Sequence, residues 1–118
     1  MSVDYIIHKK KRILEADYSL CETKDDFYKK IDELTEEVAA SKDQVRVLTD
    51  VTFANVGNDF LSRAKTKAKP LQHKVDKSAI LGVTGFKKLI LNAYTKYTGS
   101  KMRAFTSRTE ALDYLASD

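Results

Sequence analysis

The segment from Ala79 to Leu115 constrains the fold more than any other part of the chain. It begins with a continuous apolar run, 79–83, which predicts a strand buried on both faces. The glycine-bracketed turn Gly82–Gly85 follows, and a helical pattern starts at Phe86. A short strand and a closing helix complete the segment. This alternation of strand and helix is typical of a small α/β domain.

The helix after the turn has the clearest apolar periodicity in the sequence. Its apolar residues recur at i, i+3, i+4, i+7, i+8 and i+11, which predicts one buried face. The residues of that face are Phe86, Leu89, Ile90, Ala93, Tyr94 and Tyr97. Gly99 is expected to end the helix. The residues that we expect to be almost fully buried around one sheet are Leu48, Ile80, Leu81, Leu89, Ile90 and Leu112.

The remaining elements follow from alternation, capping and breaker residues. The predicted strands are 3–8, 13–18, 45–51, 79–83 and 102–105. Thr23 with Asp26 and Ser107 with Glu110 have capping-box spacing and should open two helices. Pro70 should end a helix by about residue 69. The order ββαβαβαβα therefore predicts one α/β domain over residues 1–118, with a mixed, mostly parallel sheet covered by helices.

Composition places the chain among globular proteins of the cytoplasm. It is 42% hydrophobic and 32% charged, as in ordinary soluble domains. Its one cysteine, Cys21, excludes an intrachain disulfide, and a reducing compartment is the natural setting. The start has no signal-peptide pattern, and no apolar stretch approaches the roughly 20 residues of a membrane span.

The charge is distributed unevenly. Residues 1–60 contain 9 Lys/Arg and 13 Asp/Glu, whereas residues 61–118 contain 12 Lys/Arg and 4 Asp/Glu. Such a split is typical of a face for an anionic partner, of attraction between protomers or, most often, of two solvated surfaces. With a first hairpin that leaves a sheet edge to cover, it leads us to expect a homodimer. The basic runs at 8–12 and 63–77 raise nucleic-acid binding as a weaker alternative. The first run falls on a predicted hairpin turn and no nucleic-acid-binding motif accompanies it, which favours a solvated turn.

Two segments, 50–55 and 82–85, follow parallel strands and should meet at the carboxyl edge of the sheet, where ligands of such sheets bind. The candidate ligand- or partner-binding residues there are Asp50, Thr52, Asn55, Gly82, Thr84, Gly85, Lys87 and Lys88. Thr84 is expected to cap the helix, whose first amides, with Lys87 or Lys88, would hold a carboxylate or phosphate. The alternative is structural: Gly82 permits close packing or an unusual dihedral angle.

The sequence predicts no enzyme. Neither His8 nor His73 has a partner at metal-ligand spacing, and Cys21 has no neighbouring histidine. Asp50 stands where α/β enzymes place a catalytic carboxylate, but Thr52 replaces the second aspartate of a phosphotransfer DxD pattern. Asp50 is therefore expected to brace its turn. We predict no catalytic residue, metal or cofactor.

Three segments carry a family resemblance: VRVLTDVTFANVGNDFLSRA, SAILGVTGFKKLILNAYTKYTG and MRAFTSRTEALDYLA. From about Val45 to Ala116 the chain resembles a bacterial family of small stand-alone STAS-like domains. These are similar in fold to anti-sigma-factor antagonists and, more distantly, to CRAL-TRIO lipid-transfer domains. The resemblance implies a STAS-like fold and an association with regulation or apolar-ligand binding.

The resemblance has one departure. Anti-sigma-factor antagonists carry a phosphorylated serine after the central strand, whereas residues 50–58 contain none. Thr84 is the better-placed hydroxyl for such a modification. The primary interpretation is a non-catalytic regulatory or interaction domain that acts through a protein partner. The main alternative is a carrier or sensor of a small apolar (lipid-like) or anionic ligand, with a pocket under the helix walled by Phe86, Tyr94 and Tyr97.

Overall fold

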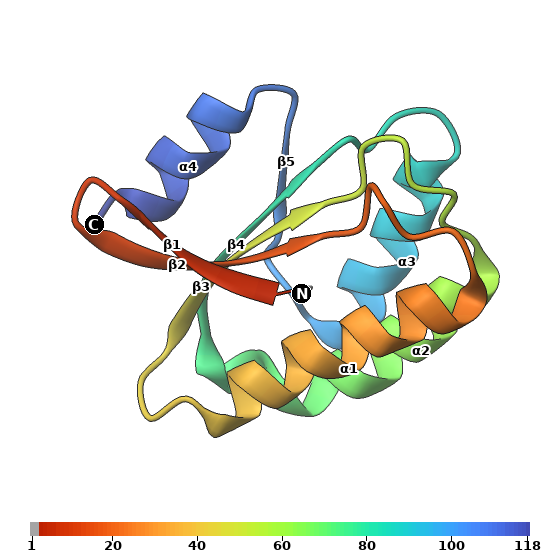
Figure 1. Cartoon of the computed structure of the whole chain (residues 1–118), viewed down its shortest axis with the longest axis horizontal. Helices are drawn as coiled ribbons and strands as arrows, with labels where there is room; N and C mark the ends of the chain where they lie inside the picture. Colours follow the sequence, from red (N-terminus) through yellow and green to blue (C-terminus); the bar gives the residue numbers. More distant parts are fainter. Residues whose placement is uncertain (1–2) are drawn as a thin grey trace.

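The computed structural model describes residues 3–118 and has one five-stranded sheet with helices on both faces (Figure 1). The strands are β1 (Val3–His8), β2 (Lys11–Asp17), β3 (Val45–Asp50), β4 (Val75–Leu81) and β5 (Arg103–Phe105). The helices are α1 (Lys24–Ala40), α2 (Asn58–Ala68), α3 (Lys87–Thr98) and α4 (Arg108–Ala116), with a 3₁₀ segment η1 (Lys69–Lys74). The predicted order of elements is confirmed.

The strands lie in sequence order, β1-β2-β3-β4-β5. β1 pairs with β2 in an antiparallel hairpin, and the other pairings are parallel. The hairpin turns at Lys9 and Lys10, which both have positive φ (49° and 70°), as a two-residue turn matched to the strand twist requires. Because β2, β3 and β4 run in parallel, the loops that follow them leave the sheet at one edge.

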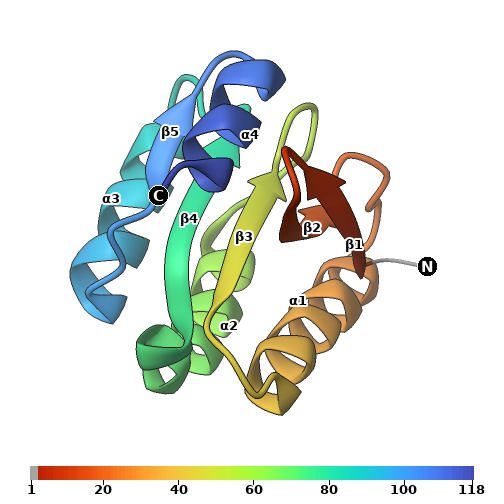
Figure 2. The ribbon, with the colours of Figure 1, turned by 90° about the vertical axis from the view of Figure 1, so that its left-hand side faces the viewer.

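The two faces of the sheet are covered unequally. α4 packs on one face, whereas α1, α2 and α3 cover the other (Figure 2). Ile13, Leu48 and Ala79 pack under α4 with Ala111 and Leu115, and all five are fully buried. The helix-rich face holds the largest apolar cluster, a second smaller one and the cavity described below.

Capping and breaker residues act largely as the sequence predicts. Thr23 and Asp26 form a reciprocal capping box at α1, and the Ser107 hydroxyl accepts from the Glu110 amide at α4. α2 ends at Ala68, and the chain continues as η1 with Pro70 in its first turn. Gly99 ends α3 in the left-handed conformation, with φ of 79°. These boundaries depend on local chemistry, which explains why the sequence locates them.

The inner face of α3 differs from the prediction. Leu48, Ile80 and Leu81 are buried as expected, but Leu89 is 69% exposed and Ile90 is half-buried. Leu112 of α4 is also half-buried. Phe86, Leu89, Ala93 and Tyr97 face solvent, and the residues turned toward the sheet are Leu91, Tyr94 and Thr98. The helix has apolar residues around most of its circumference, so periodicity alone does not select the docked face.

Candidate functional site

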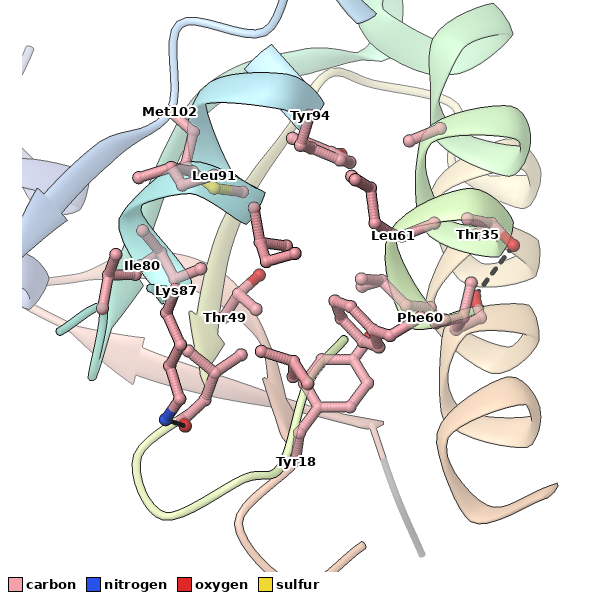
Figure 3. A pocket seen from close by; sticks show the side chains of 18 residues that line it. Tyr18, Thr35, Thr49, Phe60, Leu61, Ile80, Lys87, Leu91, Tyr94 and Met102 are labelled. Atoms are coloured by element: carbon pink, nitrogen blue, oxygen red, sulfur yellow. Dashed lines mark hydrogen bonds between the residues drawn. The ribbon is translucent and has the colours of Figure 1, made fainter. Parts of the chain in front are cut away.

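A cavity of about 80 Å³ lies between the helix-rich face of the sheet and helices α1, α2 and α3 (Figure 3). Its floor includes Thr49 and Val51 from the end of β3 and Ile80 from β4. Leu61 and Ala64 of α2 line one side, and residues of α3 line another. The lining is almost entirely apolar, as in sites that receive small organic ligands.

Helices α2 and α3 border this cavity without closing it. Among the described residues, α2 has no buried side chain, and Thr98 is the one buried residue of α3. By contrast, α1 buries Phe27, Ile31 and Val38. The apolar residues of α2 and α3 that line the cavity, among them Leu61, Ala64 and Leu91, are only partly buried. This differs from the close packing normal in protein interiors.

Polar contacts at the outer rim hold α2 in place. The Arg63 guanidinium pairs with the Asp32 carboxylate of α1 through two contacts of 3.2 and 2.7 Å. On the side of α3, the ammonium groups of Lys65 and Lys69 lie 4.7 and 4.5 Å from the centre of the Tyr97 ring. These interactions fix the helix from outside while the space beneath it stays open.

An aromatic cluster closes one end of the cavity. The Phe60 ring meets the Tyr18 and Phe27 rings edge-on, with centroids 5.2 and 5.6 Å apart. Tyr18 and Phe60 both line the cavity (Figure 3). Burial raises the pKa of the Tyr18 hydroxyl above its ordinary value. Tyr18 therefore stays neutral at physiological pH and provides a ring wall with no charge.

Besides Tyr18, four side chains with polar groups line the otherwise apolar space: Thr35, whose hydroxyl donates to the Ile31 carbonyl, and Thr49, Lys87 and Tyr94. Burial raises the pKa of Tyr94 to about 12, partly opposed by a hydrogen bond with Gln72, so Tyr94 is also neutral. Thr49 is 7% exposed and its hydroxyl is turned toward the cavity (Figure 3). Lys87 extends along the wall, and its ammonium donates to the Val51 carbonyl at 2.8 Å. The cavity thus combines apolar walls with a hydroxyl and a cation.

The loops at the carboxyl edge are packed together. The Val51 amide donates to the Leu81 carbonyl at 2.9 Å. Gly82 has φ of 88°, and a Cβ added there would lie 2.6 Å from the Thr52 Cα. The Asp50 carboxylate accepts from the Thr52 amide at 2.9 Å, so Asp50 braces its turn as expected. Both candidate segments lie at one edge, and the glycine permits their close approach.

The start of α3 differs from the anion site expected at that edge. The N-cap is Phe86, with no side-chain capping bond, so the Thr84 side chain is not the helix cap. The amides of Lys87, Lys88 and Leu89 donate to the carbonyls of residues 84, 85 and 86. The first amides of the helix are therefore engaged within the turn. The cation that remains near the cavity is the Lys87 ammonium.

The candidate residues are divided between four environments. Lys87 lines the cavity, whereas Asn55 and Phe86 line a separate outer groove. Thr52 and Gly82 contact each other through their backbones. The exposed candidates of the α3 turn are Thr84, Gly85 and Lys88. Of the three predicted aromatic walls, Tyr94 lines the cavity, whereas Phe86 and Tyr97 do not and are exposed.

Thr49 is a cavity residue that the sequence analysis missed. Its signal was a hydroxyl directly after the apolar pair Val47–Leu48 of strand 45–51. Phe60 and Leu61 were also missed as lining residues, because they indicated only the apolar face of a helix. Leu91 was missed because it lies outside the apolar face predicted for its helix. Which apolar residues face a hollow depends on how the helices dock on the sheet.

The carboxyl edge also displays large apolar side chains to solvent. Leu20, after β2, is 88% exposed, and Phe53, after β3, is 91% exposed. Phe53 has φ of 62°, a left-handed conformation that is costly for a bulky residue. Phe86, after β4, is exposed as well. Three neighbouring loops thus each present one apolar side chain.

Residues 3–118 contain neither a metal-binding cluster nor a membrane-spanning helix. Within that range, no three His, Cys, Asp or Glu side chains gather as a metal site would require. No helix in the same range combines the length and apolar character of a membrane crossing.

Comparison with known proteins identifies the fold. The chain matches no protein-family model and no curated protein. Among solved structures, it is similar to an uncharacterised protein of the DUF3478 family with a SpoIIAA-like fold, from Shewanella loihica PV-4. The two chains are 13% identical, the alignment covers 98% of this chain and 93% of the other, and the TM-score is 0.65. The predicted STAS-like fold is confirmed.

Proposed function

We propose that this chain is a non-catalytic STAS-like binding module that carries or senses a small apolar ligand in the cavity under α2 and α3. The observation that carries the proposal is the open space beneath two helices that have, among the described residues, only Thr98 buried. Apolar walls with a few polar groups are the usual lining of a small-molecule site.

The energetic cost of the cavity supports a functional role. At roughly 24 cal/mol per Å³ for an enclosed empty cavity, an unfilled space of about 80 Å³ lowers stability by at most about 2 kcal/mol, because this one is partly open. That is a large fraction of the free energy of unfolding of a small domain. A ligand that occupies the space restores the missing dispersion contacts and stabilises the folded state by mass action.

Filling the cavity tests this proposal. Ala64 of α2 lines the space, and Ala64→Leu adds about three carbon groups to it. We expect the free energy of unfolding to rise by roughly 0.5–2 kcal/mol and ligand uptake to be lost. Ala93→Leu, on the exposed face of α3, is the matched control and should leave uptake unchanged.

Uptake is measured by native mass spectrometry of the purified protein and by amide chemical shifts during titration with short n-alcohols. Wild type and Ala93→Leu should show saturable shifts around Thr49 and Leu91, and Ala64→Leu should show none. Equal shifts in all three proteins, or no shift at the cavity in wild type, would contradict the proposal.

A second candidate function is docking of a protein partner at the carboxyl edge. Phe53 favours it, because this side chain is almost fully exposed on a backbone of high energy. Such strain persists where it serves a function. Leu20 and Phe86 extend the apolar surface on the neighbouring loops. A second copy of the chain is the first partner to test, because the uneven charge of the two halves favours self-association.

Sedimentation velocity at micromolar concentration tests this candidate. We expect wild type to be a dimer at low salt, to dissociate partly at high salt, and to become monomeric as Phe53→Asp. Ile7→Asp is the control, because Ile7 is an exposed apolar residue on β1, away from this edge. A wild-type monomer at both salt concentrations would exclude self-association through this surface.

A further inference from the structure

The lining of the cavity carries positive charge only. Of the 18 residues in the described chain that line it, Lys87 alone carries a charge at neutral pH. The lining contains no Asp or Glu, and its two tyrosines are neutral because burial raises their pKa values. A cation beside an apolar space with no facing carboxylate favours a ligand that brings the negative charge itself.

The Lys87 ammonium has capacity for such a ligand. It donates to the Val51 carbonyl at 2.8 Å and approaches the Gly82 carbonyl at 3.5 Å. A lysine ammonium has three N–H donors, so at least one is left for a ligand. No salt bridge to Lys87 occurs within residues 3–118. Its partners in this structure are neutral carbonyl groups.

Thr49 provides an independent indication. The residue is more than nine-tenths buried, and within residues 3–118 its hydroxyl has no hydrogen-bond partner. Because no buried polar side-chain atom of the described residues lacks a partner, the Thr49 oxygen is accessible from the cavity, where a ligand can bond to it. Thr49 and Val51 are two positions apart on the chain as it leaves β3, and both line the cavity. The free hydroxyl and the carbonyl that holds the ammonium therefore belong to the same wall.

We propose that the cavity binds a short monocarboxylic acid, with its apolar body between α2, α3 and the sheet and its carboxylate at Lys87. This inference rests on the proposed function and specifies the ligand class. The space of about 80 Å³ is smaller than the roughly 150 Å³ cavity that admits benzene, so the apolar body has about four carbons. The carboxylate accepts a charge-assisted hydrogen bond from the ammonium.

The test compares pentanoate with pentanamide, a neutral probe of nearly the same shape. Dissociation constants come from amide chemical-shift titrations of Thr49 and Leu91. Wild type should bind pentanoate at least about tenfold more tightly than pentanamide. Lys87→Met should lose this preference while its affinity for pentanamide stays within about threefold of wild type.

Lys88→Met is the matched control, because it removes an exposed lysine from the next position. It should keep the preference for pentanoate, and thermal unfolding of both variants verifies that they fold. If wild type binds the two probes equally, or if Lys87→Met keeps the preference, the acid-specific inference is wrong and the apolar site stands. If neither probe reaches the cavity of wild type, the proposed function fails together with this inference.

Discussion

Gly82 lies against Thr52 so closely that the two loops leave no space for a side chain between them. A Cβ built on Gly82 would lie 2.6 Å from the Thr52 Cα, and the glycine has φ of 88°. Both the contact and the backbone angle therefore disfavour any residue with a Cβ at position 82. This contact joins the ends of β3 and β4 beside the wall that holds Lys87.

Gly82→Ala should lower the free energy of unfolding by roughly 2–4 kcal/mol, because it adds a collision with backbone to a left-handed penalty. Gly85→Ala is the control: Gly85 also has positive φ (58°), but an added Cβ meets nothing within 4 Å. Its cost should be only about 1 kcal/mol. Urea unfolding measures both costs. Equal costs would show that the collision with Thr52 does not add to the destabilisation by Gly82→Ala.

Leu48 and Leu89 should respond very differently to truncation. Leu48 is fully buried under α4, so Leu48→Ala should cost about 2–5 kcal/mol. Leu89 is exposed on α3, so Leu89→Ala should change stability by less than about 0.5 kcal/mol. Chemical denaturation distinguishes them. A large loss for Leu89→Ala would mean that its face is covered in solution.

Thr49→Val should stabilise the protein, contrary to the usual effect of removing a buried polar group. Within residues 3–118 the Thr49 hydroxyl has no hydrogen-bond partner and opens onto a largely apolar cavity, so its loss breaks no hydrogen bond and should raise the free energy of unfolding by up to about 1 kcal/mol. Thr98 is equally buried, but its hydroxyl donates to the Tyr94 carbonyl at 2.8 Å. Thr98→Val should therefore cost about 1 kcal/mol. Destabilisation by both changes would imply that Thr49 has a partner.

Phe53→Gly should also raise stability, by roughly 0.5–1 kcal/mol. Phe53 has little packing to lose, and glycine adopts its left-handed conformation without a steric penalty. Leu20→Gly is the comparison, because Leu20 is equally exposed but does not have positive φ in the described chain. That change should lower stability by up to about 1 kcal/mol. Thermal unfolding reports both, and a destabilised Phe53→Gly would indicate that Phe53 packs against something in solution.

The Asp32–Arg63 ion pair should make the free energy of unfolding depend on pH in the acidic range. The hydrogen bond from Arg63, the largest cause, and the nearby Lys67 charge hold the pKa of Asp32 below its usual range. The stabilisation is complete above the ordinary aspartate pKa of about 3.9 and is lost as pH falls through the folded value. Asp32→Asn should cost up to about 1 kcal/mol at pH 7, and nothing near pH 2.

Glu36→Gln is the control for Asp32→Asn. Glu36 is an exposed residue on the same helix, and its replacement should show little cost at either pH. Urea midpoints at several pH values decide the matter. A cost for Asp32→Asn that persists unchanged at low pH would assign it to helix packing rather than to the ion pair.

Much of the fold was predictable because its signals are local. The Thr23 capping box, the Pro70 break and the left-handed Gly99 each act through neighbouring backbone groups. The buried strands were recognisable as continuous apolar runs. Since parallel strands end at one edge, the sequence also predicted that segments 50–55 and 82–85 would lie together.

The candidate site was predicted only in part. Lys87 was among its expected residues, but as an auxiliary to free helix amides that are in fact engaged within the turn. Thr49 and Phe60 were not among them, although both line the cavity. A hydroxyl within the predicted strand 45–51 was the one available signal for Thr49. The sequence does not show whether that hydroxyl has a hydrogen-bond partner.

The sequence by itself determined the order of elements and several helix ends, because propensity, capping and apolar runs operate over a few residues, and a family resemblance implied the STAS-like fold. It did not locate every strand end: β4 spans Val75–Leu81 instead of the predicted 79–83. The tertiary structure decided which face of α3 is docked, since apolar residues from Leu89 to Tyr94 surround much of the helix. It also decided where the core stays open, because packing depends on how whole helices are placed. The cavity with Lys87 and Thr49 is a consequence of that placement.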